Sequence, residues 1–222
     1  MERHAQEEIE SLKNKILTMG GLAEEMIILS NKIFTERNEN LCCEVLEKEE
    51  KVNKLQMEID EGCVRILALY QPEATDLRTI MAATKINAEL ERVADQAVNM
   101  AETCSYHFLK EVPVTPLTEI PRMSTIAQEM IKQSLDAFTK RDAELAKSVL
   151  QKDDELDTLK SNVFNQIIGL IKSHPEKAKQ FIDLILISKN LEKIGDHATN
   201  ISEDVIFMVI GKDIRHHAET AL

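Results

Sequence analysis

The chain has 222 residues, a net charge of −12, no tryptophan and only 4% aromatic residues, while 43% are hydrophobic. Few glycines and prolines interrupt it, and such a composition favours a helical globular protein. The negative charge argues against nucleic acid and anionic membranes as main partners, because binding phosphate groups needs clustered lysine and arginine. Metal cations or a basic protein surface fit this charge better.

The first half of the chain predicts three long helices. Segment 7–34 carries apolar residues at spacings of three and four, the pattern of an amphipathic helix. Asn38 or Asn40 can cap a second helix, which ends near Gln71. Pro72 is expected at the first position of a third helix that runs to about residue 106, because its missing N–H is no loss there.

The second half repeats this plan after a break. Three prolines interrupt the segment 109–121, which predicts a linker. Beyond it, Asp142 is placed to cap the fifth helix, Pro175 to open the sixth, and Gly211 to end it.

Direct repetition supports a duplication. Segments 23–27 and 34–38 return at 127–131 and 138–142, both at an offset of 104 (127 − 23; 138 − 34). A further block returns at an offset of 101 (191 − 90). This period is too long for a solenoid repeat, which has roughly 20–50 residues. We therefore expect a duplicated domain, and any functional site should occur twice.

The expected fold class is all-α, with two tandem, similar three-helix bundles made of six long helices. No stretch of 18 or more apolar residues occurs, and the first residues are polar, so a cytoplasmic protein without a membrane span is expected. The division into domains is predicted as a first bundle over 1–108, a linker over 109–121 and a second bundle over 122–222.

The most similar block of the repeat carries the same polar pattern in both halves. A four-residue spacing places three oxygen-bearing side chains on one helical face, where like charges repel unless a cation neutralises them. The predicted metal ligands are Glu91, Asp95, Asn99, Glu192, Asp196 and Asn200. A second acidic stripe precedes them on the second and fifth helices, and its possible additional ligands are Glu50, Asn53, Asp154 and Asp157.

These carboxylates can also form a simple solvated face, since Arg92 and Lys193 lie beside them in the sequence. His197 has Gln96 as its counterpart, so we expect a peripheral residue and not an essential ligand. Glu-x-x-His, phosphate-binding loops, nucleophile elbows and catalytic triads are missing, so no catalytic residue and no organic cofactor are predicted. Free thiols are expected at Cys42, Cys43, Cys63 and Cys104, because they form no Cys-x-x-Cys pair.

Taken together, these motifs resemble the PhoU family of phosphate-signalling proteins. The resemblance rests on Leu90-Glu91-Arg92-Val93-Ala94-Asp95 with Asn99, on Leu191-Glu192-Lys193-Ile194-Gly195-Asp196-His197 with Asn200, and on Gln71-Pro72 followed by Asp76-Leu77-Arg78. It covers essentially the whole chain. One departure is that Asn53 stands where the second half has Asp157, which leaves the first acidic site one charge poorer.

The resemblance implies a non-catalytic negative regulator of the phosphate-starvation response and phosphate uptake. It implies a cytosolic adaptor between a phosphate ABC transporter ATPase and a membrane sensor histidine kinase, reaching the membrane only through these partners. It also implies a homodimer and, in some members, a multinuclear iron or zinc cluster on the Glu/Asp-x-x-x-Asp motifs. The alternatives are a metal-storing or metal-dependent helical bundle that uses the paired carboxylates, and a structural scaffold without a ligand.

Overall fold

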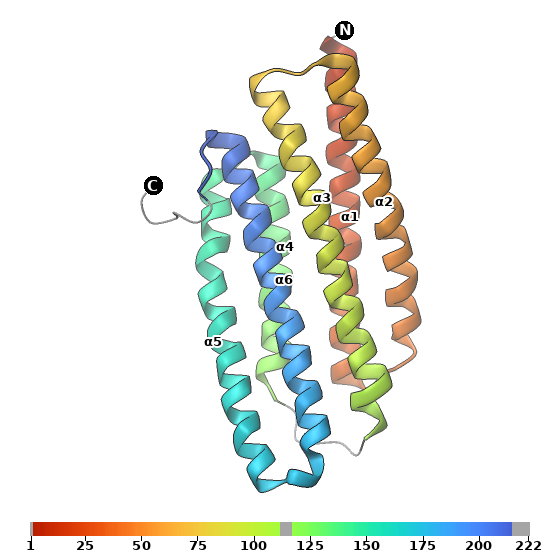
Figure 1. Ribbon diagram of the computed structural model, residues 1–222, viewed down its shortest axis with the longest axis vertical. Helices are drawn as coiled ribbons and strands as arrows, with labels where there is room; N and C mark the ends of the chain where they lie inside the picture. Colours follow the sequence, from red (N-terminus) through yellow and green to blue (C-terminus); the bar gives the residue numbers. More distant parts are fainter. Residues whose placement is uncertain (1, 112–116, 215–222) are drawn as a thin grey trace.

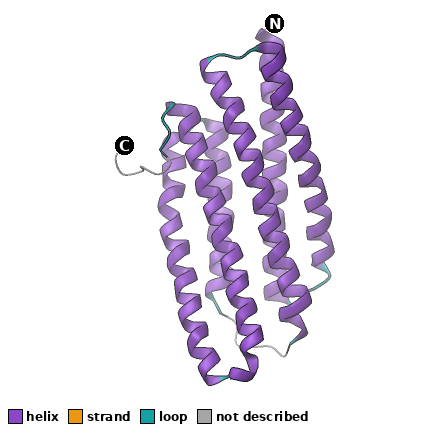
Figure 2. Cartoon of the chain, in the orientation of Figure 1, coloured by secondary structure: helices purple, strands orange, loops and turns teal. Residues whose placement is uncertain are grey.

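In a computed structural model of the chain, residues 2–111 and 117–214 are described, and they contain no β-strand (Figure 2). Two units of three long helices lie side by side (Figure 1). The six helices are α1 (Glu2–Glu36), α2 (Leu41–Tyr70), α3 (Ala74–Glu102), α4 (Glu119–Lys140), α5 (Ala143–Ser173) and α6 (Ala178–Ile210). The expected all-α fold of two similar three-helix bundles is confirmed.

Each unit is an antiparallel bundle in which every helix contacts the other two. The units meet through α3 against α6 and, less extensively, α1 against α4 (Figure 1). The helices in both of these pairs run in opposite directions, so the duplicated units face one another through equivalent surfaces. The helix that carries the repeated acidic motif therefore lies at the junction of the two units in both halves.

The apolar residues at three- and four-residue spacing form the core, as the periodicity predicts. In α1 they are fully buried or nearly so, and the buried residues of both units belong to one continuous cluster. Burial of apolar side chains on every helix is the main favourable term in folding such a bundle. The buried positions of α1 include Ile9, Leu12, Ile16, Met19, Ala23, Met26 and Ile33.

Several predicted helix ends agree with the structure. The Asp142 carboxylate accepts hydrogen bonds from the backbone N–H groups of Glu144 and Leu145, both at 3.0 Å, and so caps α5. Gly211 ends α6 at φ 78°, a left-handed conformation that glycine adopts without a steric penalty.

Pro72 is not the first residue of a helix. The N-cap of α3 is Glu73, with an extended backbone, and α3 begins at Ala74, so Pro72 belongs to the preceding loop. Gln71, the residue before this proline, avoids the right-handed helical region as the steric rule requires, but its backbone is left-handed at φ 46° and not extended. Pro175 opens a short 3₁₀ turn, Pro175–Lys177, directly before α6.

The two units differ at the ends of their helices. Helix α1 has 35 residues and α4 has 22, so α1 extends further at its N-terminus than α4 does in the described part of the second unit. Helix α3 continues directly into a π-helical turn, Thr103–His107. Within the predicted linker over 109–121, residues 112–116 lie outside the described part of the chain, and α4 already begins at Glu119.

Candidate functional site

The first acidic cluster lies between α2 and α3. Glu91 and Asp95 are four residues apart on α3, and Glu49 on α2 lies close enough to interact electrostatically with them. Burial and the neighbouring charge of Asp95 raise the pKa of both Glu49 and Glu91 above the ordinary value, and the charge of Glu49 raises the pKa of Glu91 further. Negative charge thus accumulates between α2 and α3, and the charge of Arg92 offsets only part of its effect on Glu91.

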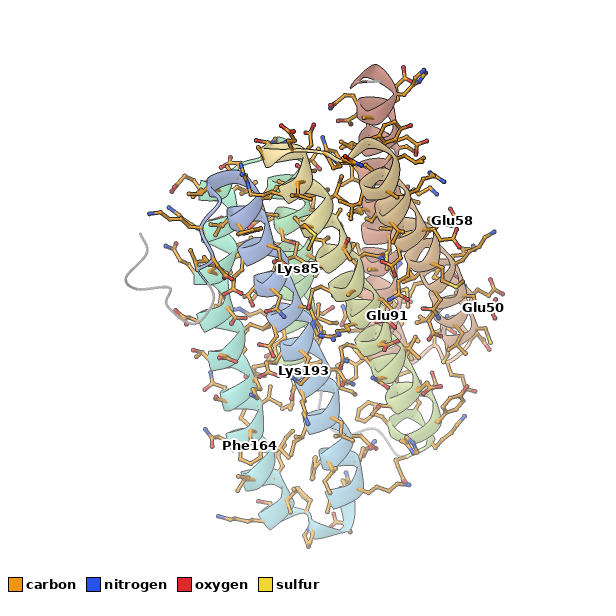
Figure 3. The ribbon with its side chains drawn as sticks, turned by 45° about the horizontal axis from the view of Figure 1, so that its top comes forward. Glu50, Glu58, Lys85, Glu91, Phe164 and Lys193 are labelled. Carbon is orange, nitrogen blue, oxygen red and sulfur yellow. The ribbon has the colours of Figure 1, made fainter. Side chains whose placement is uncertain are left out.

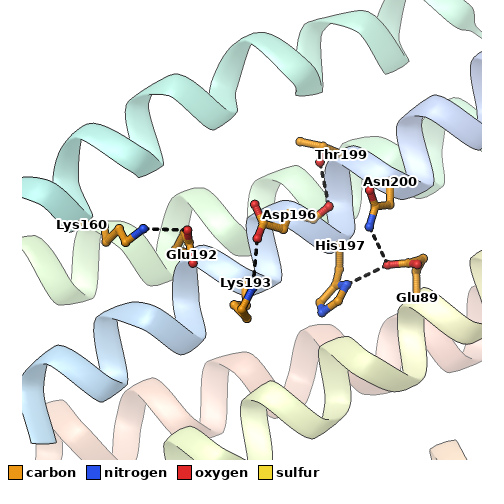
Figure 4. A network of polar contacts seen from close by, with 8 residues as sticks. All are labelled: Glu89, Lys160, Glu192, Lys193, Asp196, His197, Thr199 and Asn200. Atoms are coloured by element: carbon orange, nitrogen blue, oxygen red, sulfur yellow. Dashed lines mark hydrogen bonds and ion pairs between the residues drawn. The ribbon is translucent and has the colours of Figure 1, made fainter. Parts of the chain in front are cut away.

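The second acidic cluster lies at the equivalent place between α5 and α6. Asp153 of α5 is half-buried, and burial together with Asp196, Asp157, Glu192 and Asp154 raises its pKa from 3.8 to about 6. Two lysines partly neutralise this cluster (Figure 4). Lys160 donates to Glu192 at 2.8 Å, and Lys193 lies 3.4 Å from Asp196.

The structure places some of the predicted ligands within the acidic clusters and leaves others exposed to solvent. Glu91, Asp95, Glu192 and Asp196 are half-buried at the inner edge of the clusters. The outer positions are exposed to solvent, namely Glu50, Asn53, Asn99, Asp154 and Asp157. The amide of Asn200 donates to Glu89 of α3 at 3.0 Å, across the junction of the two units (Figure 4).

Glu49 and Asp153 belong to the second acidic stripe but were not among its predicted ligands, although the structure leaves both of them partly buried. They are equivalent in the repeat (153 − 49 = 104). Glu49 also lies four residues after Val45 and three before Val52, both of which are fully buried. This spacing places a side chain beside the buried stripe of a helix, and it is the sequence signal that distinguishes Glu49 from Glu50.

His197 is not peripheral, contrary to the expectation from its lack of a repeated partner. Its Nδ1 lies 2.7 Å from the carboxylate of Glu89, and both side chains are about nine-tenths enclosed, at 13% and 14% exposure. Burial opposes ionisation of Glu89, but hydrogen bonds from His197 and Asn200 outweigh it and lower the pKa of Glu89. The contact joins α3 to α6, whose residues are too distant in sequence for a pattern to pair them.

The donor chemistry of the clusters suits hard cations, since carboxylate oxygens from two helices face one another. Within residues 2–111 and 117–214, however, no three histidine, cysteine, aspartate or glutamate side chains are gathered as a ready ligand set. In the second cluster, Glu192 and Asp196 are ion-paired with Lys160 and Lys193, which occupies carboxylate oxygens that a cation would need. A cation would thus have to displace these lysines, and metal binding stays a prediction.

The sequence model of the PhoU domain matches the chain twice, over residues 16–104 and 120–205. The chain belongs to the PhoU family. Each match contains one acidic cluster, so the family's domain repeat coincides with the repeat of the site.

Relatives and solved structures agree with this family. The chain is 34% identical over 209 residues to the phosphate-specific transport system accessory protein PhoU homolog of Pseudomonas putida, covering 94% of this chain and 82% of that protein. It is 32% identical to the Clostridium acetobutylicum protein of the same name, covering 93% and 94%. The crystal structure of PhoU from Pseudomonas aeruginosa superposes with a TM-score of 0.89 at 33% identity, covering 93% and 99%.

A further PhoU crystal structure, from Streptococcus pneumoniae, has a TM-score of 0.87 at 24% identity and supports the fold alone. It covers 94% of this chain and 98% of its own. Among the helices that the structure describes, none is long and apolar enough to cross a membrane.

Proposed function

We propose that this protein is a negative regulator of the phosphate-starvation response and of phosphate uptake. It acts as a cytosolic adaptor between the phosphate ABC transporter ATPase and a membrane sensor histidine kinase, and it has no catalytic activity of its own. The observation that carries the proposal is the match of both halves to the PhoU domain, together with relatives named as phosphate-specific transport accessory proteins. A continuous buried core through both bundles supports a role as a firm body that presents surfaces to partners.

Deletion of the gene tests this role. In high phosphate, the deletion strain should express phosphate-starvation genes that the parent represses, and the intact gene supplied in trans should restore repression. Expression that stays low in the deletion strain would remove the basis for negative regulation. Co-purification with the transporter ATPase and with the cytosolic part of the kinase tests the adaptor step separately.

We further propose that the two acidic clusters bind iron or zinc, with multinuclear binding as the form expected from the family resemblance. Glu49, Glu91 and Asp95 would hold a cation in the first unit. Asp153, Glu192 and Asp196 would do so in the second, after Lys160 and Lys193 move aside. A bound cation would neutralise the carboxylates and draw α2 toward α3, or α5 toward α6. The raised pKa of Asp153 supports this idea, because burial and then the charges of four neighbouring carboxylates raise it, and a bound cation would offset both effects.

Elemental analysis of protein purified without a chelator or an affinity tag tests the metal proposal. Stoichiometric iron or zinc should be present and should disappear when Glu91, Asp95, Glu192 and Asp196 are all changed to alanine. The matched control changes four exposed carboxylates that lie outside the clusters, Glu39, Glu144, Glu155 and Glu176. Equal metal content in both variants, or none in the unmodified protein, would contradict the proposal.

Metal storage or metal-dependent catalysis is the alternative use of the same carboxylates. The names of the relatives favour regulation, since they describe accessory proteins of a transport system. We also propose a homodimer, which analytical ultracentrifugation of the full chain would test.

A further inference from the structure

The outer face of α5 and α6 carries a groove of about 510 Å³ that is separate from the core. Phe164 of α5 and Ile185 of α6 supply its apolar wall, and Lys160, Lys189 and Lys193 lie along it. Figure 3 shows Phe164 on α5 and Lys193 on the neighbouring α6. One end of the groove reaches Glu192, so it borders the second acidic cluster.

The duplicated unit shows what is special about this groove. At the equivalent place in the first unit, Asn87 of α3 donates to the Gln56 carbonyl at 3.0 Å and to Asp60 at 2.9 Å, and so bridges α2 and α3. In the second unit, Ser188 replaces Asn87 (188 − 87 = 101) and Phe164 replaces Asp60 (164 − 60 = 104). The shorter serine bonds back to the carbonyl of its own helix at Ile185, at 2.8 Å, and does not bridge to α5.

Exposed apolar side chains lie on both helices near the groove and the turn that joins α5 to α6, and we call them the apolar strip. Phe164 and Ile168 are one helical turn apart on α5, and their side chains are 49% and 39% exposed. On α6, Ile182 and Leu186 are likewise one turn apart, with 49% and 43% exposure. Single exposed apolar residues are common on protein surfaces, but several on the two helices that form one groove are typical of an interaction site.

The charge beside the strip points to one kind of partner. The chain as a whole carries −12, whereas this groove has three lysines. Lys160 and Lys193 are ion-paired with Glu192 and Asp196, but Lys189 makes no ion pair with any residue in the described part of the chain. The first unit has Gln56, Ala88 and Arg92 at the three lysine positions (160 − 104; 189 − 101; 193 − 101), so only the charges of Lys160 and Lys189 are particular to the second unit.

We propose that the α5–α6 groove binds an acidic amphipathic helix of a partner protein. The apolar face of that helix would cover Phe164, Ile168 and Ile182, and its carboxylates would meet Lys189. This inference rests on the adaptor function proposed above, and it names the chemistry of one partner segment. Helices that lie in a groove and bury one apolar face are a common mode of recognition, in which aromatic anchors contribute most of the affinity.

The dimensions of the strip fit a short helix. Residues 160–168 of α5 extend over about 12 Å and residues 182–193 of α6 over roughly 17 Å, at about 1.5 Å per residue. A partner helix of about three turns covers that length. Its acidic residues would be attracted to Lys189 against the repulsion of the remaining surface, which gives the complex an orientation as well as affinity.

Photo-crosslinking in living cells identifies the occupant. The photoreactive residue p-benzoylphenylalanine in place of Phe164 keeps an aromatic ring in the groove, and the same residue in place of Val64 on the exposed face of α2 is the matched control. We expect the Phe164 position to crosslink to the transporter ATPase or the sensor kinase, at a peptide with acidic and apolar residues at helical spacing. A crosslink to a second copy of this chain, a basic peptide as the product, or equal crosslinking from the Val64 position would overturn the inference.

Point variants separate this inference from the adaptor function. Both Phe164→Asp and Lys189→Glu change exposed side chains, so thermal melting should stay close to that of the unmodified protein. Each variant should weaken binding of the purified partner at least tenfold, and the effect of Lys189→Glu should shrink at high salt. Val64→Asp, at an exposed apolar position of the first unit, should change binding less than twofold.

The deletion strain supplies the decisive comparison. If deletion derepresses the starvation genes and Phe164→Asp fails to restore repression while Val64→Asp restores it, the groove is the docking site. If both variants restore repression fully, the groove inference is wrong and the adaptor function stands. If deletion itself has no effect on expression, the adaptor function fails first.

Discussion

Two adjacent glycines in the middle of α1 provide a direct test of how the bundles pack. Gly20 is buried where α1 meets α4, and a Cβ built on it would lie 2.2 Å from Cδ1 of Leu135. Gly21 is exposed, and a Cβ built there meets nothing within 4 Å. The same substitution at neighbouring positions of one helix should therefore have opposite effects.

Alanine raises helix propensity at both positions by about 0.5–1 kcal/mol relative to glycine. At Gly21 this gain is uncompensated, so Gly21→Ala should stabilise the protein by that amount. At Gly20 the new methyl group forces Leu135, which is only 4% exposed, out of its place. Overpacking of a core costs about 1–3 kcal/mol, so Gly20→Ala should destabilise the protein by up to roughly 2 kcal/mol.

Urea unfolding followed by far-UV circular dichroism measures both variants. The double variant Gly20→Ala, Leu135→Ala removes the obstructing side chain, so the penalty of the new methyl group should largely vanish when compared with Leu135→Ala alone. The refuting result is a stabilisation of equal size at Gly20 and Gly21. That outcome would mean that α1 and α4 do not approach closely at Gly20, and the packing of the two bundles would have to be revised.

Three further predictions concern charge and thiol reactivity. Asp153→Asn should stabilise the chelator-treated protein at pH 7, because a pKa raised from 3.8 to about 6 makes stability fall as the pH rises through that window. The shift corresponds to about 3 kcal/mol for a fully buried group and to roughly 1 kcal/mol after solvent screening. Urea titrations at several pH values measure this difference in the free energy of unfolding. Glu89→Gln should cost roughly 1–3 kcal/mol at pH 7, and because the pKa of Glu89 is lowered, this difference should shrink as the pH falls below about 4.5. In the native protein a thiol reagent should react quickly with Cys43 alone, since Cys43 is exposed whereas Cys104 is buried with a pKa raised to about 12; rapid modification of Cys104 would contradict the structure.

The fold was predictable from the sequence because every helix buries one face, and this burial requires apolar residues at a regular helical spacing. Apolar residues at spacings of three and four mark the core, and Asp142 and Gly211 carry local signals for helix ends. The prediction for Pro72 is wrong because a proline near a helix start can lie in the first turn or in the preceding loop. The backbone conformation of Glu73 decides between these positions, and the sequence does not specify it.

The site was only partly predictable for a different reason. The repeated motif identified Glu91 and Asp95 because their spacing places them on one face of one helix. The contact of Glu89 with His197 joins residues on different bundles, and no local spacing encodes it. Such pairs follow from how the duplicated units dock, which becomes visible only once the fold is assembled.

Duplication also helps to separate what the fold needs from what a partner needs. The buried stripes and the acidic clusters occur in both units, so a symmetric structure or a pair of equivalent ligands explains them. Phe164 and Lys189 are particular to the second unit, because Asp60 and Ala88 stand at the equivalent places in the first unit, where Asn87 bonds to Asp60. Folding alone gives no reason for an aromatic residue and a lysine in place of the Asp60 and Ala88 of the first unit. Recognition of a single partner segment accounts for the asymmetry, and it leaves the opposite unit available for a second, different contact.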